Sequence, residues 1–553
     1  MKDTREVNMP FSSAFARIND LPAKKVAIAV TVFFAILSSV VVCFHEPWLD
    51  EAQSWLIARD ASYYDIFLVL PHVEGHVPFW WFLLSIPAKL GVPYEIGLKA
   101  VNIIIAIAAC AVFEFKSPFP NAFKILFPFT YFFFYQYAQI SRPYMLLVLA
   151  LFIAAMTFRS RTDKPWAHLL SLILLCLSDT FGIGAAGGIA VAWTLSVIAS
   201  IARKDKKNIR SNVKQAVCLA VLLVSALIMI WNITPNLDAT ATGNINAANI
   251  IKAFVSELFI VPSELCFTTF TLYGPLAAQE LGIVQLIIAG LLSIVIWAMF
   301  FKAFLHKDIA LDIVLPIFIF AAAGSLYIYS HHYGLLLMLG IYCAWISLER
   351  HKSVGVSKDL FSGIGAVICA VAVFMGLMWT GFSAVNDICH PYWVSRDLYT
   401  WIEANDLESC TWLAVWDIEV EDGKILSQNT GVTREAIPVN PYLKSSKPLN
   451  YNNEGYTYAL FRDNSDSENA ADIEKWKMAP EPDLILCSDV AEVMAVIDEM
   501  GYTSTYDIVY VKECRSTWKA DFTKGGAIVY ARRESALPIK PDIADLPSIM
   551  GQG

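Results

Sequence analysis

Long apolar stretches recur through residues 26–385 of this chain and limit its fold more than any other feature. Each holds about 17 to 25 residues with few charges, the length that an α-helix needs to cross the apolar core of a bilayer. Of the 553 residues, 56% are hydrophobic and only 16% are charged, whereas soluble domains carry about 25% charged residues. The sequence therefore predicts a polytopic α-helical membrane protein with about 11 transmembrane helices.

The expected spans follow one another without an internal repeat. In chain order they are 26–44, 97–115, 122–138, 144–158, 166–177, 181–202, 216–231, 281–305, 309–329, 335–347 and 360–385. The spans at 166–177 and 335–347 are short, so the count holds to within about two. The stretch 76–91 is short, aromatic and interrupted by Pro78 and Pro87. It either crosses the membrane or lies in the interface as an amphipathic anchor.

Basic residues between the spans set the orientation, because cytoplasmic loops carry an excess of Lys and Arg. If 76–91 lies flat on the outer surface, every basic cluster falls on the same side as Lys24 and Lys25. These clusters are 159–164, 203–214, Lys302, 306–307 and 350–352. We therefore expect a plasma (inner) membrane protein with residues 1–25 in the cytoplasm and the first outer loop, 45–96, outside.

The composition changes near residue 386. Residues 386–553 are polar and acidic and lack long apolar runs. Helix-like and strand-like stretches alternate there, at 396–405, 484–487, 490–500, 508–512 and 527–531. This pattern predicts a small extracytoplasmic α/β domain after a transmembrane domain of residues 26–385. Four cysteines fall in it and are either reduced or joined in disulfides: Cys389, Cys410, Cys487 and Cys514.

Charge, cysteine spacing and one outer loop refine this picture. The formal net charge of −9 argues against nucleic acid as a partner. The cysteines form no C-x-x-C pair, which argues against a zinc site or a dithiol redox motif. The outer loop 234–280 carries an apolar patch at 250–270 and is expected to dip into the interface as part of a lid.

Two adjacent carboxylates, Asp50 and Glu51, follow directly on the first apolar run. Ionised side chains so close to a membrane boundary are costly and usually functional. Pro47 suits the first turn of a helix, and the dipole of a helix that begins there favours a negative charge at Asp50. Glu51, Trp55 and Arg59 then share one helix face. The alternative interpretation is a juxtamembrane helix with solvated acids.

With this orientation, polar residues gather at the outer ends of the helices. They are Asp50, Glu51, Arg59, His72, Glu74, His76, Gln136, Gln139, Ser141, Arg142, Tyr144, Asp179, His331, His332 and Tyr333. A carboxylate pair, several cations and several aromatic rings at one depth predict a single cavity between lipid and water.

Several of these candidates also have a purely structural interpretation. Arg142 can be an interfacial residue whose charge reaches water. Asp179 can cap the helix that begins near Phe181. His331 and His332 could form a metal-ligand pair, but neighbouring histidines on a helix point apart and no third ligand stands at helical spacing. A phosphate contact or a structural role is favoured for both, and no metal ligand is assigned.

The order of these motifs resembles the GT-C superfamily of integral-membrane glycosyltransferases. The carboxylate pair lies near the start of the first outer loop, His76-Val-Pro-Phe-Trp-Trp follows, and Ser-Arg142-Pro-Tyr stands at a helix end. The chain is similar above all to the branch with the dolichyl-phosphate-mannose protein mannosyltransferases and the bacterial lipid A aminoarabinose transferase. That branch typically carries a His-Pro-Pro-Leu-like segment, whose first proline is replaced by Val77 here. The motifs lie within residues 26–202, and the rest resembles the superfamily by architecture.

The resemblance implies an inverting glycosyltransferase that moves a sugar from a polyprenyl-phosphate donor to an acceptor hydroxyl on the extracytoplasmic face. It assigns the general base to Asp50, with Glu51 orienting the acceptor or Asp50. Arg142 is the first candidate for binding the departing phosphate, because a guanidinium makes two parallel hydrogen bonds to it. The further phosphate candidates are His331, His332, Arg59 and His76, and the substrate candidates are Tyr144, Gln139, Asp179 and Tyr333.

The resemblance leaves the sugar open, and the acceptor is a glycan, a lipid or a protein. Some members of the superfamily need a divalent ion, so a metal cofactor also stays open. The long lipid of the donor is expected in a groove between helices, among the membrane lipids.

The main alternative function is a polytopic transporter or lipid flippase. Charged residues of such proteins are expected near the bilayer midplane, often between repeated halves. Here they stand at the outer helix ends and no repeat is visible. A third interpretation, a membrane-anchored sensor with a ligand-binding tail, does not account for the charges around the first span.

Overall fold

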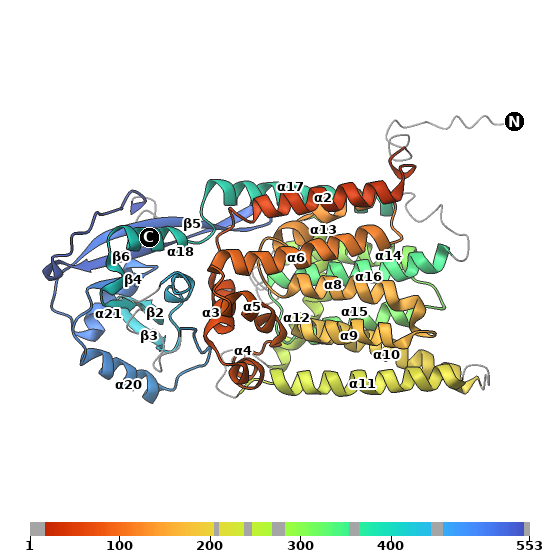
Figure 1. Cartoon of the computed structure of the whole chain (residues 1–553), viewed down its shortest axis with the longest axis horizontal. Helices are drawn as coiled ribbons and strands as arrows, with labels where there is room; N and C mark the ends of the chain where they lie inside the picture. Colours follow the sequence, from red (N-terminus) through yellow and green to blue (C-terminus); the bar gives the residue numbers. More distant parts are fainter. Residues whose placement is uncertain are drawn as a thin grey trace.

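The protein consists of a helical bundle with a small α/β domain at one end (Figure 1). The computed structural model describes residues 17–203, 209–236, 246–267, 282–352, 364–443 and 457–546. Helices dominate the bundle, and their apolar faces are long enough to make it a polytopic membrane protein.

Among the described residues, eight helical segments are long and apolar enough to cross a membrane, and not the eleven expected. They contain α2 (Ala23–Val41), α6 (Tyr94–Lys116), α8 (Tyr144–Thr157), α10 (Thr180–Ala202), α11 (Ile209–Ile233), α14 (Ile283–Phe304), α16 (Tyr333–Lys352) and α17 (Ile364–Cys389). Short 3₁₀ turns extend two of them, η4 (Phe158–Arg161) after α8 and η8 (Ser330–His332) before α16.

The three remaining stretches depart from a full span for local reasons. α9 (Pro165–Ser178) and α15 (Ala310–Gly324) are apolar but have only 14 and 15 residues. The stretch expected at 122–138 is broken. It forms α7 (Asn121–Leu126), the 3₁₀ turn η2 (Phe127–Phe129) and the π-helix η3 (Phe132–Tyr137). Pro128 falls within η2, and a proline cannot donate the hydrogen bond that would continue the α-helix.

Four short helical segments lie between the bundle and the C-terminal domain (Figure 1). They are α3 (Leu49–Asp60), η1 (Asp65–Val69), α4 (Leu70–Glu74) and α5 (Phe79–Lys89). α5 has 11 residues, too few for a span, and packs against α3. α3 begins at Leu49, after Trp48 as N-cap, so the expected helix start at Pro47 is wrong by two residues.

The loop expected to form a lid is partly helical. α12 (Ala247–Phe259) and α13 (Val261–Cys266) cover most of the apolar patch and pack against α14. Residues 237–245 and 268–281 of this loop lie outside the described residues.

The C-terminal domain is built on a four-stranded sheet of order β1-β4-β6-β5. β1 (Trp412–Ala414) pairs in parallel with β4 (Leu484–Cys487), and β6 (Asp521–Arg532) pairs antiparallel with both β4 and β5 (Tyr506–Trp518). A second hairpin, β2 (Asp417–Glu421) and β3 (Lys424–Asn429), stands beside it. The helical segments are α18 (Ser395–Ala404), η9 (Leu407–Ser409), α19 (Ala436–Val439), α20 (Asp466–Lys477), α21 (Val490–Met500) and η10 (Arg533–Ser535). All eleven cysteines of the chain are free thiols.

The β5–β6 hairpin joins the two parts of the molecule. It extends beyond the sheet toward α17 (Figure 1). Lys519 at its tip is fully buried, and its ammonium contacts the Glu264 carboxylate at 3.1 Å. The Lys519 carbonyl accepts a hydrogen bond from the Ser383 hydroxyl of α17 at 2.9 Å. Polar contacts therefore fix the hairpin tip inside the bundle.

The basic segments gather at the bundle end away from the C-terminal domain. α8 runs to that end, where Arg161 pairs with Asp312 near the start of α15 at 2.9 Å. The start of α2, the end of α10 and the start of α11 lie at the same end (Figure 1). Which end faces the cytoplasm stays a prediction of the positive-inside rule.

Candidate active site

The two adjacent carboxylates of α3 have different surroundings. The Asp50 side chain is 29% exposed, and its Oδ2 lies 2.7 Å from Nη1 of Arg142. Arg142 stands just before α8, is almost entirely buried, and packs its guanidinium over the Tyr144 ring. Burial alone would lower the Arg142 pKa, but the nearby Asp50 carboxylate opposes this, and the pKa lies above its usual value. A carboxylate and a guanidinium from two distant segments thus form one ion pair.

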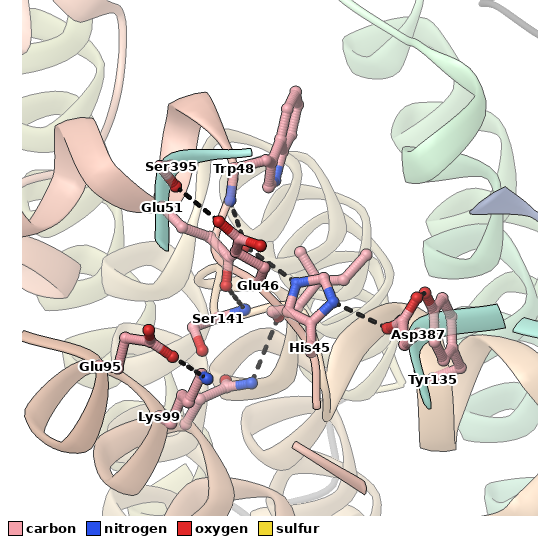
Figure 2. Close-up of polar contacts among 12 residues, drawn as sticks. His45, Glu46, Trp48, Glu51, Glu95, Lys99, Tyr135, Ser141, Asp387 and Ser395 are labelled. Carbon is pink, nitrogen blue, oxygen red and sulfur yellow. Dashed lines mark hydrogen bonds and ion pairs between the residues drawn. The ribbon is translucent and has the colours of Figure 1, made fainter. Parts of the chain in front are cut away.

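Glu51, in contrast, is fully buried and satisfied by the protein itself. Its Oε1 accepts a hydrogen bond from the Ser141 backbone N–H at 2.6 Å. Its Oε2 accepts from the Trp48 backbone N–H at 3.2 Å and lies 3.1 Å from Nε2 of His45 (Figure 2). Glu51 therefore connects the start of α3 to the segment just before Arg142, the two places that hold the ion pair.

A cavity of about 660 Å³ lies between the bundle and the C-terminal domain. The bundle side includes Trp48, Leu49, Gln136, Arg142, Tyr144, Tyr329 and His331, and the other side includes Trp393, Arg434, Ser488, Thr523, Lys524, Gly525 and Gly526. Its volume falls in the range of small-molecule sites. Because Arg142 is in its wall, the Asp50–Arg142 pair stands at the cavity.

Glu74 and His76 belong to the same charged group. Glu74 accepts a hydrogen bond from the Gln53 amide at 2.9 Å, and burial raises the Glu74 pKa to about 8 despite the nearby Arg142 charge. Burial, and then Arg142, lowers the His76 pKa to about 3. A neutral imidazole can still donate or accept a hydrogen bond, so the phosphate contact expected of His76 stays a prediction.

The two neighbouring histidines have separate surroundings. His331 lies in the cavity wall, its ring near the Trp48 indole. His332 is buried, and its Nδ1 accepts a hydrogen bond from the Tyr329 backbone N–H at 2.9 Å. Nε2 must then carry the proton, 2.9 Å from the Tyr144 hydroxyl. Both His332 nitrogens are used within the protein, so only His331 is placed to meet a ligand.

Asp179 has the local role that its sequence position allowed. Its Oδ1 accepts a hydrogen bond from the Phe181 backbone N–H at 3.0 Å and caps α10. Burial raises the Asp179 pKa to about 6, opposed by the cap and by the charge of Arg142. Asp179 is a helix cap close enough to Arg142 to influence the ion pair.

Three expected site residues lie elsewhere. Arg59 pairs with Asp60 at 2.7 Å and lines a separate hollow beside Tyr94 and Tyr442. Gln139 is fully buried and donates its amide hydrogen to the Phe134 carbonyl at 3.0 Å. Tyr333 is buried with its ring against Trp518. None of these three lines the cavity, because Arg59 faces the other hollow and the side chains of Gln139 and Tyr333 are buried in packed protein.

Other cavity residues were not identified from the sequence as site residues. Gln136, in the cavity wall, was expected at an outer helix end, but no motif singled it out for a ligand. The same holds for Glu74, which belongs to the charged group around Arg142 and not to the cavity wall. The C-terminal wall, with Thr523 to Gly526, carries no sequence signal, because only the long hairpin brings it to the bundle. Within the described ranges, no three His, Cys, Asp or Glu side chains group so as to hold a metal ion, and none is assigned to one.

No family model, no curated protein and no solved structure matches this chain.

Proposed function

We propose that the protein is an inverting glycosyltransferase of the GT-C type, which uses a sugar linked to a polyprenyl phosphate. The observation that supports this most is the Asp50–Arg142 ion pair, whose guanidinium lies in the wall of a cavity. It offers a partly exposed carboxylate as a proton acceptor and a fixed guanidinium for a phosphate. General base and leaving-group stabilisation are the two functions such a reaction needs.

The donor phosphate replaces Asp50 as the partner of Arg142. The phosphodiester of the donor carries one negative charge, as a carboxylate does, and matches the planar guanidinium with two parallel hydrogen bonds. Its interaction with Arg142 strengthens during the reaction, because the departing polyprenyl phosphate gains a second negative charge. Asp50 is then released from its ion pair and can accept a proton. His331, in the same wall, contributes a hydrogen bond to the phosphate or the sugar.

The reaction balances with these groups alone. The acceptor oxygen attacks the anomeric carbon from the face opposite the phosphate, and its proton passes to Asp50. The bond from the anomeric carbon to the phosphate oxygen breaks, and the electron pair stays on the phosphate. Arg142 stabilises this growing negative charge in a site largely shielded from water. The products are the inverted glycoside and polyprenyl phosphate.

An apolar groove in the bundle suits the lipid part of the donor. It has a volume of about 250 Å³ and is lined from α14, α16 and α17 by side chains that include Trp297, Phe300, Leu337 and Trp379. The acceptor enters the cavity along its C-terminal wall, where Lys524 and the two glycines lie. By the positive-inside rule this side is extracytoplasmic.

The test uses purified protein in proteoliposomes with a polyprenyl-phosphate-linked sugar labelled in the sugar. We expect release of free polyprenyl phosphate that depends on an added acceptor. A flippase would instead move the intact donor between leaflets and release no polyprenyl phosphate. Transbilayer movement without release, across a panel of glycan, lipid and peptide acceptors, would replace the enzyme with the transporter.

A further inference from the structure

His45 stands between Glu51 on one side and Asp387 with Tyr135 on the other (Figure 2). It follows α2 and is fully buried. Its Nε2 lies 3.1 Å from Oε2 of Glu51 in α3, and its Nδ1 lies 3.0 Å from Oδ2 of Asp387 in α17. The ring also packs against Tyr392 of the C-terminal domain, with centroids 4.6 Å apart.

The contacts continue on both sides of His45. Asp387 accepts hydrogen bonds from the Tyr135 hydroxyl at 2.8 and 2.9 Å. The Tyr135 oxygen lies 2.9 Å from Oγ1 of Thr517. Thr517 is the last residue but one of β5, directly before the turn of the hairpin. Because the Tyr135 proton goes to Asp387, Thr517 is the donor in this contact. One hydrogen-bonded chain thus runs from the hairpin, through Asp387 and His45, to Glu51.

We infer that His45 is a positioning residue, which couples docking of the β5–β6 hairpin to the geometry of the Asp50–Arg142 pair. The inference rests on the proposed function where it concerns turnover. Glu51 is the last member of the chain and holds the Ser141 N–H next to Arg142 and the Trp48 N–H at the start of α3. A displacement of the hairpin therefore reaches both sides of the ion pair.

A doubly protonated imidazole explains why two acids share His45. Each ring nitrogen faces a carboxylate, and only the imidazolium donates from both. Burial lowers the His45 pKa, but the Glu51 and Asp387 carboxylates outweigh it and raise the pKa to about 9. A neutral ring would leave one buried carboxylate against a nitrogen lone pair, which is unfavourable.

The residue next to His45 provides a second connection to the C-terminal domain. The Glu46 carboxylate is buried and accepts hydrogen bonds from the Ser395 hydroxyl at 3.1 Å and from the Arg396 backbone N–H. These donors stand at the start of α18. The short segment between α2 and α3 thus contacts the C-terminal domain through Glu46 and the candidate active site through His45.

The inference is tested with His45→Gln, which keeps a polar side chain but cannot bridge two carboxylates as a cation. The matched control is His390→Gln, the same change at a partly buried histidine whose Nε2 lies 3.1 Å from Nη1 of Arg515. Hydrogen–deuterium exchange is measured at residues 516–521 and 48–52, and turnover is measured in the polyprenyl-phosphate assay. We expect faster exchange in both segments, and a kcat loss of about tenfold or more with a smaller change in donor KM.

The exchange measurement keeps the inference separate from the proposed function. If the wild type releases no polyprenyl phosphate, the function fails, and faster exchange of both segments in His45→Gln still supports the coupling. Exchange equal to that of the wild type in either segment would overturn it. If His45→Gln does not fold, Thr517→Val removes the hydroxyl at the other end of the chain and should increase exchange at 48–52; no increase would also overturn it.

Discussion

At the scale of single residues, Asp50 and Glu51 illustrate how neighbours on one helix separate in function. Successive side chains on an α-helix point roughly 100° apart. Asp50 is therefore directed to Arg142 with part of its surface exposed, while Glu51 is directed into the core. The expectation that Glu51 orients Asp50 or the acceptor stays a prediction, but its full burial favours a role through the backbone over contact with substrate.

The main effect of Glu51→Gln should be a loss of protein stability, and its effect on the catalytic step should be smaller. The amide cannot accept from all three donors around Glu51 and leaves the buried His45 cation with one carboxylate fewer. Breaking a buried ion pair by removing one partner costs about 3 kcal/mol. Thermal unfolding in detergent should show a clearly lower Tm than for Asp50→Asn, whose carboxylate is partly exposed. An unchanged Tm for Glu51→Gln would contradict this assignment.

Two variants of Arg142 should separate the effect of its charge on donor binding from the effect of its planar shape. Arg142→Lys keeps a positive charge but not the planar group with parallel donors, and Arg142→Ala loses both. We expect donor KM to rise in the order wild type, lysine variant, alanine variant, and kcat to fall in the same order. Donor titrations on the purified variants measure this. Normal kinetics for Arg142→Ala would make Arg142 an interfacial arginine without a role in the donor site.

At the scale of elements, the sequence predicts best where one local pattern decides the structure. The ranges expected for β4 and α21, 484–487 and 490–500, are those observed, because alternation and helical spacing are local signals. The span expected at 122–138 failed, because hydrophobicity does not show that Pro128 and a π-helix interrupt it. Side and depth along the sequence predicted a charged group around Arg142 and also assigned Arg59 to it. Arg59 instead pairs with Asp60 beside another hollow, because α3 lies across the bundle end.

The coupling through His45 should appear in the pH dependence of stability. The folded pKa, about 9, exceeds the usual value near 6.5, so the folded state binds the proton more tightly. The resulting stabilisation, on the order of 3 kcal/mol, is complete below about pH 6.5 and is lost as the pH rises through about 9. Unfolding of wild type and His45→Gln across this range should give a stability difference that shrinks with rising pH. A constant difference would mean that His45 stays neutral.

At the scale of the whole molecule, packing places the candidate site between two separately patterned parts of the chain. The bundle contributes the ion pair, and the hairpin of the C-terminal domain contributes the opposite cavity wall. Composition reveals the two parts, but the cavity depends on contacts between residues hundreds of positions apart, such as Tyr135 with Thr517. No local signal in the sequence records such contacts.

The orientation predicts opposite accessibility at the two ends. Single cysteines are introduced at exposed Lys164, at the far end, and at exposed Lys424 in β3, after the exposed Cys43 and Cys389 are replaced by serine. A membrane-impermeant thiol reagent applied to intact cells should label position 424 and leave position 164 unlabelled until the membrane is opened. Labelling at position 164 in intact cells would reverse the orientation.

The central claim is that Asp50 accepts the proton of the acceptor, and the rate of polyprenyl-phosphate release by Asp50→Asn tests it most directly. The amide keeps the size of the side chain but cannot serve as the base, so we expect near-normal donor binding and a loss of kcat of about a hundredfold or more. Asp163→Asn, the same change at an exposed aspartate of the far end, should retain the wild-type rate. If Asp50→Asn at a matched protein level retains most of the wild-type kcat, Asp50 is not the base and the proposed mechanism is wrong.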